Sequence, residues 1–250
     1  MDNENITLSF CITCKNRMWQ IEKTLPQNLK NNLSMKERVN FILVDFGSTD
    51  GLQEWIGKNF EQELDDGYLQ YYYTEELEFW HASIAKNTAH ILSKSDILVN
   101  LDCDNYTGKD GGKFVLEKMI QWGVHNTVIH QPNQDIWNGS YGRIAISMQN
   151  FMSLGGYDES FEPMGYQDND LLLRARGAGL KYYRLEDKRY NKAIKNDKKE
   201  SIKQTGSTIS WEEMDEKNQL RSIKNLSLGK VAANQDKKHI GIIQNVYRLV

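Results

Sequence analysis

The chain of 250 residues is 39% apolar and 26% charged, a composition typical of globular domains, and no apolar run approaches the ~20 residues that a membrane-spanning helix requires. Its three cysteines are too few for a disulfide scaffold and fit a reducing compartment. The net charge of −3 conceals an uneven distribution: residues 181–250 carry 16 Lys and Arg against 9 Asp and Glu, whereas residues 1–180 carry 15 against 25. Such a basic part is typical of a solvated helical surface, or of a segment that contacts phospholipid, nucleic acid or an anionic substrate.

Apolar periodicity predicts strands that alternate with helices through the first hundred residues. In chain order, we expect strands at 8–13, 39–44, 69–73 and 97–101 and helices at 17–29, 52–60 and 80–92. The strands are nearly continuous apolar runs, which indicates a mostly parallel sheet covered by helices on both faces.

The second half of the chain has a sparser pattern. We expect strands at 143–147 and 181–185 and helices at 148–154, 168–178 and 211–223. Residues 187–206 are charged and lack periodicity, so we predict a mobile loop there, and the C-terminal end shows no clear pattern.

Polar side chains stand where predicted strands end, at Thr13, Asp45 and Asp102. Because ligands bind beyond the carboxyl ends of parallel strands, we expect these three positions to surround one crevice. Asp102 and Asp104 flank a single residue and can approach one cation, and carboxylates suit Mg²⁺ and Mn²⁺. A solvated turn is the alternative interpretation; a metal site this sparse would need a diphosphate ligand to complete it.

Asp45, Lys86 and Asn87 are the next polar positions to explain, and Asp45 sits where a nucleotide base could dock. Asp45 precedes a Gly-Ser-Thr-Asp-Gly turn, where Asp50 can cap the next helix, but capping does not explain Asp45 itself. Lys86 and Asn87 lie within a predicted helix, where a lysine is ordinarily solvated and an asparagine is a poor helix former.

Asp168 and Asp170 open another predicted helix. The helix dipole favours acids there, and the functional alternative makes one of them a general base. Cys11 and Cys14 are expected to face opposite sides of a strand, which argues against a zinc or redox pair. The histidines form no ligand pair at helical spacing; they are His81, His90, His125, His130 and His239.

Five segments together resemble the family 2 and family 7 type glycosyltransferases with the GT-A fold. The opening strand and helix are "TCKNRMWQIEKTLPQNL", and "FILVDFGSTDG" is similar to the family's Val-Asp-x-Gly-Ser-Thr-Asp-Gly turn. "HASIAKNTA" looks like its helix with an Ala-Lys-Asn step, and "NLDCDN" stands where the family has Asp-x-Asp. "GGYDESFEPMGYQDNDLLLRA" resembles the acceptor-side segment of β-1,4-galactosyltransferase and chondroitin-polymerase-like enzymes.

The resemblance covers roughly residues 6–185 and implies an α/β fold of GT-A type. That fold has a mostly parallel, Rossmann-like central sheet flanked by helices and a smaller antiparallel acceptor-side part, here followed by a C-terminal helical tail. It divides residues 1–186 into a nucleotide-binding half at 1–106 and an acceptor-binding half at 107–186. Residues 187–250 would form the loop and basic tail, packed on the same domain.

On the donor side, the resemblance implies roles for four residues. Thr13 and Asp45 would line the pocket for the nucleotide base, with uracil the expected base. Lys86 and Asn87 would stand near the donor nucleotide.

The resemblance also implies metal and acceptor residues. Asp104 would be the principal ligand of Mn²⁺ or Mg²⁺, and Asp102 would face the ribose or share the metal. Asp168 would be the catalytic base and would bind the acceptor together with Tyr166 and Gln167.

The chain departs from the family pattern at two places. Gln167 replaces the family's Glu, so a charge on the acceptor side is lost. The segment "LEDKRYNKAIKND" lacks the His that often completes the metal site, so His239, another residue or water would replace it.

The implied activity is a metal-dependent, inverting transfer of a hexose or N-acetylhexosamine from a nucleotide-diphosphate donor, expected to be a UDP-sugar. The acceptor would be a hydroxyl of a saccharide or lipid-linked glycan. Trp137, Tyr141 and Tyr166 could stack on sugars, or be ordinary core or surface aromatics. Residues 138–143 would form a loop near the sugar, and the loop at 187–206 could close over the donor.

Two alternatives remain at the level of the sequence. A nucleotidyltransferase would want a Gly-rich phosphate loop after the first strand, and "TCKNRMW" has none. A non-catalytic glycosyltransferase-like binding subunit would bind nucleotide without turnover. Since "MDNENITLSF" has no signal-peptide pattern, we expect a cytoplasmic enzyme. The resemblance implies a role in polysaccharide biosynthesis, without a nucleic-acid partner. Its basic C-terminal part could contact the inner face of the membrane.

Overall fold

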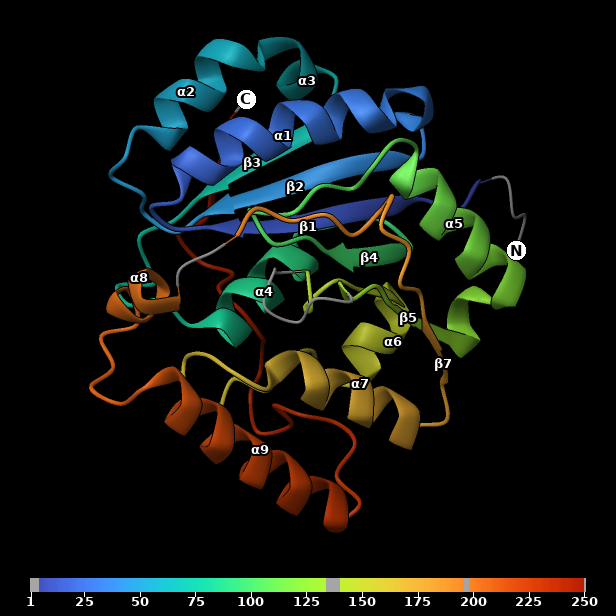
Figure 1. The fold of residues 1–250 in the computed structure, drawn as a ribbon, viewed down its shortest axis with the longest axis vertical. Helices are drawn as coiled ribbons and strands as arrows, with labels where there is room; N and C mark the ends of the chain where they lie inside the picture. The colour runs from blue at the N-terminus through green and yellow to red at the C-terminus, as the bar shows by residue number, and fades with distance from the viewer. Residues whose placement is uncertain (1–4, 134–139, 196–197, 250) are drawn as a thin grey trace.

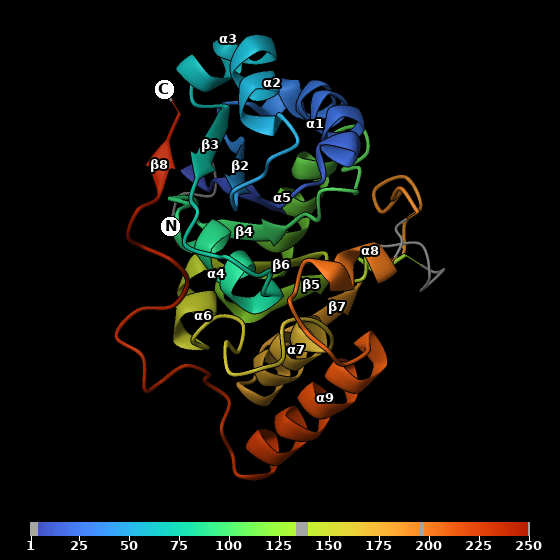
Figure 2. The same ribbon diagram turned by 90° about the vertical axis from the view of Figure 1, so that its left-hand side faces the viewer.

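The computed structural model describes residues 5–133, 140–195 and 198–249. One sheet lies between two groups of helices (Figures 1 and 2). The strands are β1 Leu8–Cys14, β2 Val39–Asp45, β3 Leu69–Tyr73, β4 Ile97–Asn100, β5 Thr127–His130, β6 Ile144–Ser147, β7 Lys181–Arg184 and β8 Tyr247–Arg248. The helices are α1 Met18–Asn32, α2 Leu52–Asn59, α3 Glu61–Asp65, α4 Ala82–Ile91, α5 Gly111–Trp122, α6 Met148–Ser153, α7 Gln167–Gly177, α8 Lys198–Lys203 and α9 Trp211–Ser227, with 3-10 turns η2 Leu33–Met35 and η3 Val124–Asn126.

Within the described residues the strands form one sheet in the order β7-β5-β6-β4-β1-β2-β3-β8. β1 pairs in parallel with β2 and β4, β2 with β3, and β5 with β7, whereas β6 runs antiparallel to β4 and β5, and β8 to β3. This mixed, mostly parallel sheet flanked by helices confirms the predicted fold class. Because Cys14 is in register with Asp45 and Cys11 with Asn100, the segments that follow β1, β2 and β4 meet at one edge.

Each face of the sheet has its own apolar core. On one face, side chains of α1, α2 and α5 pack on alternate residues of β1 and β2. On the other face, α4, α6 and α7 cover the residues in between. Cys14 belongs to the first core and Cys11 to the second, which confirms that they point to opposite sides.

The sequence patterns missed α5 and β5 and misjudged part of the segment 187–206. Residues 190–194, here called the strap, run beside the loop that follows β4. The Ile194 N–H donates to the Asp104 carbonyl at 2.8 Å, and the Tyr106 N–H donates to the Lys192 carbonyl at 2.8 Å. The predicted loop is therefore wrong at α8, which is a helix, whereas the strap is a loop held by backbone hydrogen bonds.

The C-terminal segment returns across the molecule after α9, which packs on α7. The Ala233 N–H donates to the Leu154 carbonyl and the Ile242 N–H to the Thr88 hydroxyl, both at 2.9 Å. β8 then adds to the sheet edge at β3 (Figure 2). None of the described helices is both long enough and apolar enough to cross a bilayer.

Candidate active site

A cavity of about 190 Å³ lies at the carboxyl edge of the sheet, where β1 and β4 end. It brings together six of the residues that the sequence singled out, from segments far apart in the chain. Those six are Thr13, Lys86, Asp102, Asp104, Gln167 and Asp168; the remaining lining residues are Lys15, Arg17, Gln20, Trp80, Ala82, Cys103, Met164, Ser201 and Gln204.

Lys86 forms the centre of the charged part of this cavity. Its Nζ lies 2.7 Å from Asp168 Oδ1 and 3.7 Å from Asp102 Oδ1, and its side chain is only 5% exposed. Burial lowers the pKa of Lys86, but the two carboxylates more than offset burial, so the pKa lies above its ordinary value. Burial raises the pKa of Asp168, and the Lys86 charge opposes this rise. The ammonium group thus holds two carboxylates from different elements in one cluster.

Asn100, the last residue of β4, fixes the start of the Asp-x-Asp loop. Its Nδ2 donates to Asp102 Oδ1 at 3.0 Å and to the Gly142 carbonyl at 2.9 Å. The amide therefore ties Asp102 to the loop that enters β6, and both face the Lys86 cluster.

Asp104 is buried beneath the same loop. Burial raises its pKa to about 7, and the neighbouring Asp102 charge adds to the rise. The Asn105 Nδ2 donates to Asp104 Oδ1, and Arg143 in turn donates to Asn105 Oδ1 at 2.8 Å. Arg143 is fully buried, which lowers its pKa to about 10, and its charge partly offsets those of the two carboxylates.

The donor set fits a hard divalent cation with few protein ligands. Among the described residues, no three His, Cys, Asp or Glu side chains gather to hold an ion. Because Asp104 keeps a raised pKa despite Arg143, further positive charge would be stabilised beside the two carboxylates. Mg²⁺ takes one or two carboxylates and completes its shell with water and phosphate, which suits Asp102 and Asp104.

His239 does not supply the missing metal ligand. It lines a separate cavity between the ends of α4 and α6 and the C-terminal segment, with Asn234 and Ile240. The interpretation in which His239 replaces the family's histidine is therefore corrected; water or phosphate oxygens are left to complete the shell.

The sequence profile described as glycosyl transferase family 2 matches residues 9–155, which is more than half of the chain. The chain belongs to glycosyl transferase family 2. A second profile, described as the N-terminal domain of galactosyltransferase, matches residues 126–197, the part of this glycosyltransferase that contains Asp168. A search of curated proteins finds no match.

Solved glycosyltransferases share the fold of this family 2 glycosyltransferase. Residues 1–349 of S. aureus TarS, solved with UDP-GlcNAc, superpose with a TM-score of 0.69 at 14% identity, over 92% of this chain and 68% of that one. The mannosyltransferase PcManGT of Pyrobaculum calidifontis, solved with GDP-Man and Mn²⁺, gives 0.58 at 16% identity over 73% and 55%. A mutant Drosophila β-1,4-galactosyltransferase 7, solved with manganese, UDP-Gal and xylobiose, gives 0.56 at 11% identity over 85% and 80%. The GT-A fold of the glycosyltransferase is thus confirmed.

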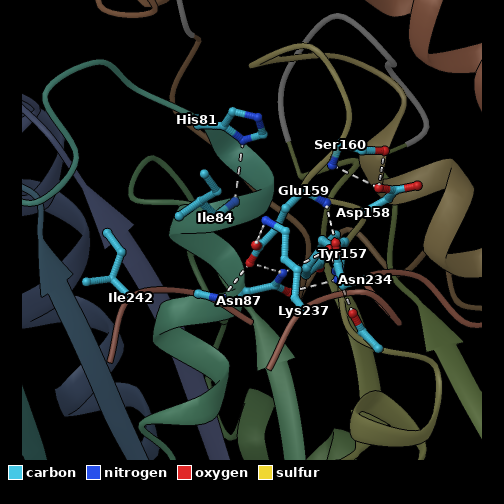
Figure 3. A network of polar contacts seen from close by, with 12 residues as sticks. His81, Ile84, Asn87, Tyr157, Asp158, Glu159, Ser160, Asn234, Lys237 and Ile242 are labelled. Atoms are coloured by element: carbon cyan, nitrogen blue, oxygen red, sulfur yellow. Dashed lines mark hydrogen bonds and ion pairs between the residues drawn. The ribbon is translucent and has the colours of Figure 1, made fainter. Parts of the chain in front are cut away.

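Asn87, expected beside the donor nucleotide, does not line the cavity. Its side chain points toward the loop at 157–159 (Figure 3). Asn87 Nδ2 donates to the Tyr157 carbonyl at 2.9 Å and to Glu159 Oε1 at 2.8 Å, and its Oδ1 accepts from the Tyr157 N–H at 2.8 Å. Since both polar atoms of this buried amide are hydrogen-bonded to the loop, Asn87 positions α4 of the glycosyltransferase against residues 157–159.

Asp45 is another residue expected at the nucleotide base. It ends β2 as predicted, but it is fully buried and does not line the cavity. Its Oδ1 accepts from the Ser48 N–H at 2.8 Å and its Oδ2 from the Tyr71 hydroxyl at 2.6 Å. Burial raises the pKa of this carboxyl, against the hydrogen bonds that favour its ionised form. Asp45 thus shapes the turn after β2. Of the two residues expected at the nucleotide base, Thr13 and Asp45, only Thr13 lines the cavity.

Of the predicted acceptor residues, Gln167 and Asp168 line the cavity and Tyr166 does not. Gln167 lines the cavity, and its buried Oε1 has no hydrogen-bond partner among the described residues. Tyr166, with φ of 62°, caps α7 but does not line the cavity. Tyr141 donates its hydroxyl to Asn169 Oδ1 at 2.7 Å and also lies outside the lining. Trp137 and residues 138–139 lie outside the described residues.

Sequence reasoning missed a group of lining residues that follows Thr13. Lys15, Arg17 and Gln20 extend from the end of β1 into the first turn of α1. Gln20 is fully buried, accepts from the Cys103 thiol at 3.3 Å, and has an Nε2 without a partner among the described residues. The sequence signal for Gln20 is its position beside Ile21 on the inner face of the predicted helix. A polar side chain is rarely buried there unless it makes hydrogen bonds.

Gly142 leaves room for the Lys86 cluster, and we expect Gly142→Ala to lower kcat for sugar transfer by about 10–100-fold. A Cβ at this position would lie 2.9 Å from both Lys86 Nζ and Asp168 Oδ2, so the pair would have to shift. Gly57→Ala is the matched control, because its Cβ would meet only Leu249 at 3.7 Å. Steady-state kinetics of the folded variants measure the effect, and wild-type kcat in Gly142→Ala would contradict it.

Proposed function

We propose that this protein is a metal-dependent, inverting glycosyltransferase that moves a sugar from a UDP-sugar to a hydroxyl of a saccharide or lipid-linked glycan. The observation that carries the proposal is the shared cavity, in which the Asp-x-Asp pair after β4 faces Lys86 and Asp168. The cavity offers two carboxylates for a cation and a third carboxylate for a proton.

Asp104 and Asp102 are the residues that would hold Mn²⁺ or Mg²⁺. When bound, the ion supplies positive charge that stabilises the leaving nucleoside diphosphate. The solved neighbours support this choice: PcManGT contains Mn²⁺ with GDP-Man, and the galactosyltransferase mutant contains manganese with UDP-Gal.

Asp168 is the proposed general base. Lys86 occupies its Oδ1, while Oδ2 accepts only a long bond of 3.2 Å from Gln167 Nε2, so Oδ2 can take a proton. The acceptor oxygen forms a bond to the anomeric carbon as the bond from that carbon to the diphosphate oxygen breaks, and the hydroxyl proton passes to Asp168. Attack from the face opposite the leaving group inverts the anomeric centre.

Gln167 supports an acceptor site next to that base. Its unpartnered, buried Oε1 is a hydrogen-bond acceptor that a sugar hydroxyl can satisfy. Unlike the Glu of the family pattern, this amide adds no negative charge beside Asp168. The acceptor therefore gains orientation from Gln167 without a second carboxylate competing for its proton.

Donor binding would use the lining residues that follow β1. Lys15 and Arg17 bring positive charge to the cavity, Gln20 offers its unpartnered Nε2, and Trp80 offers an aromatic ring. At about 190 Å³ the cavity is smaller than the ~300 Å³ or more of typical ligand sites, so the donor must displace part of its wall. α8 is the proposed lid, since it is held there by the bond from Arg17 to the Ser201 hydroxyl at 2.9 Å.

The test is metal-dependent transfer by wild type and Asp104→Asn, with UDP-sugars and a panel of saccharide acceptors. Chelation is expected to lower the wild-type rate by about 100-fold or more, because the leaving diphosphate loses its counter-charge. Asp104→Asn should lose most of its activity at any Mn²⁺ concentration. Asp66→Asn is the control, since Asp66 pairs with Lys36 on the surface. Equal rates with and without a chelator would contradict the metal assignment, and NMR of the product reports inversion.

A further inference from the structure

The C-terminal half of α9 exposes aliphatic side chains. Leu220 is 62% exposed, Ile223 is 52% exposed, and Leu228, one residue past the helix, is 62% exposed. Isolated exposed leucines are ordinary, but these three occur within nine residues. Clusters of exposed apolar side chains mark interaction sites.

Leu220 and Ile223 lie on one side of the helix. At 100° per residue they fall within the outward half of α9, and Leu228 follows the last residue of the helix. The residues that α9 buries, Met214, Asn218 and Ser222, lie on the opposite half. α9 packs through that half on α7 and lies at the rim of the molecule, beyond α7 from the sheet (Figures 1 and 2). The aliphatic side is therefore the side that no other described element covers.

Positive charge surrounds the aliphatic side chains. Residues 217–235 contain four Lys and Arg and no Asp or Glu. Lys217 and Lys224 share the outward half of the helix, and Lys230 follows its end. The acids of α9 are confined to its first turns, where Glu213 pairs with Lys217 at 3.0 Å. The two ends of α9 thus differ in charge, and only the C-terminal end is both apolar and cationic.

We propose that this basic apolar face, made of Lys217, Leu220, Ile223, Lys224, Leu228 and Lys230, docks on an anionic phospholipid surface. Aliphatic side chains insert at the boundary between headgroups and acyl chains, and lysines beside them are attracted to anionic headgroups. A protein partner is less well matched, because protein interfaces are depleted in lysine and enriched in aromatic residues. The proposal concerns the location of the enzyme and does not rest on the proposed reaction.

Vesicle co-sedimentation tests the proposal on the full chain, with vesicles of phosphatidylcholine alone and with added phosphatidylglycerol. Wild type is expected to bind the anionic vesicles, and higher salt to weaken this binding. Leu220→Gln/Ile223→Gln and Lys224→Gln/Lys230→Gln should each lower the partition constant by about tenfold or more. Leu33→Gln is the matched control, because Leu33 is an exposed leucine (55%) on the α1 side of the sheet.

Circular dichroism and UDP-sugar turnover check that the variants fold, since each change lies on the outward face and away from the cavity. Equal binding to neutral and anionic vesicles would overturn the proposal, as would variants that bind like wild type. Sedimentation velocity gives the other outcome: a wild-type dimer that Leu220→Gln/Ile223→Gln dissociates, without vesicle binding, would make this face a protein interface. Loss of turnover in all proteins, with vesicle binding intact, would refute the proposed reaction but not the docking surface.

Discussion

Asp168→Asn is expected to lower kcat for sugar transfer by about 10²–10⁴-fold, the usual contribution of a general base. Asparagine has nearly the same shape and keeps an oxygen for the Lys86 ammonium at the 2.7 Å position, but it cannot take the acceptor proton. The affinity for UDP should stay within about threefold, since the proposed role of Asp168 is to take the acceptor proton and not to bind the donor. Single-turnover transfer and calorimetric UDP binding measure the two quantities.

Lys86 makes a second variant informative. Lys86→Met removes the ion pair but leaves the Asp168 carboxylate. It therefore measures how much transfer depends on the Lys86 ammonium, separately from the carboxylate itself. If Asp168 is the base, Asp168→Asn and Lys86→Met should not multiply their losses in the double variant, because both act on one proton transfer. Full transfer by Asp168→Asn would show that another group takes the proton.

The sequence was sufficient to predict the sheet edge where the site lies. Strand ends at Thr13 and Asp102 follow from apolar runs, and parallel pairing brings such ends together without any side-chain detail. Asp168 comes from 66 residues further along the chain, and no local pattern links it to Asp102. Its role as the base is an expectation from the family resemblance, whereas the ion pair that joins it to Lys86 is visible only in the fold.

The features that the sequence could not predict have a common physical cause. Asn87 and Asp45 match family motifs, but a motif does not say which way a side chain points. Both side chains make hydrogen bonds to nearby backbone groups and do not line the cavity. The strap lacks apolar periodicity because it is held by backbone bonds to the Asp104 loop and by a few separate side-chain contacts, such as the stacking of Tyr190 on Phe114. Gly142 illustrates the same limit, because its role is the absence of a side chain at a crowded point.

Arg174→Met is expected to lower the free energy of unfolding by about 3–5 kcal/mol, the cost of leaving a buried charge without its partner. Arg174 is 2% exposed; its Nε donates to Asp170 at 2.7 Å, and its other nitrogens donate to the carbonyls of Leu154 and Gly156 at 2.8 and 2.7 Å. Asp170 also accepts from the Ser222 hydroxyl at 2.7 Å. One guanidinium therefore joins α7, the acceptor-side loop and, through Asp170, α9.

Urea denaturation measures this loss, and Lys113→Met is the matched control. Lys113 pairs with Glu117 at the same i,i+4 spacing, but both side chains are more than half exposed, so we expect a change within about 0.5 kcal/mol. In the sequence both pairs are oppositely charged residues at i,i+4 spacing, and only the burial of their side chains predicts different contributions to stability. Asp170→Asn added to Arg174→Met should restore part of the stability, because the unpaired charge is removed while an oxygen remains for Ser222. A loss below about 1 kcal/mol in Arg174→Met would mean that α7, and the base it positions, is held by apolar packing instead.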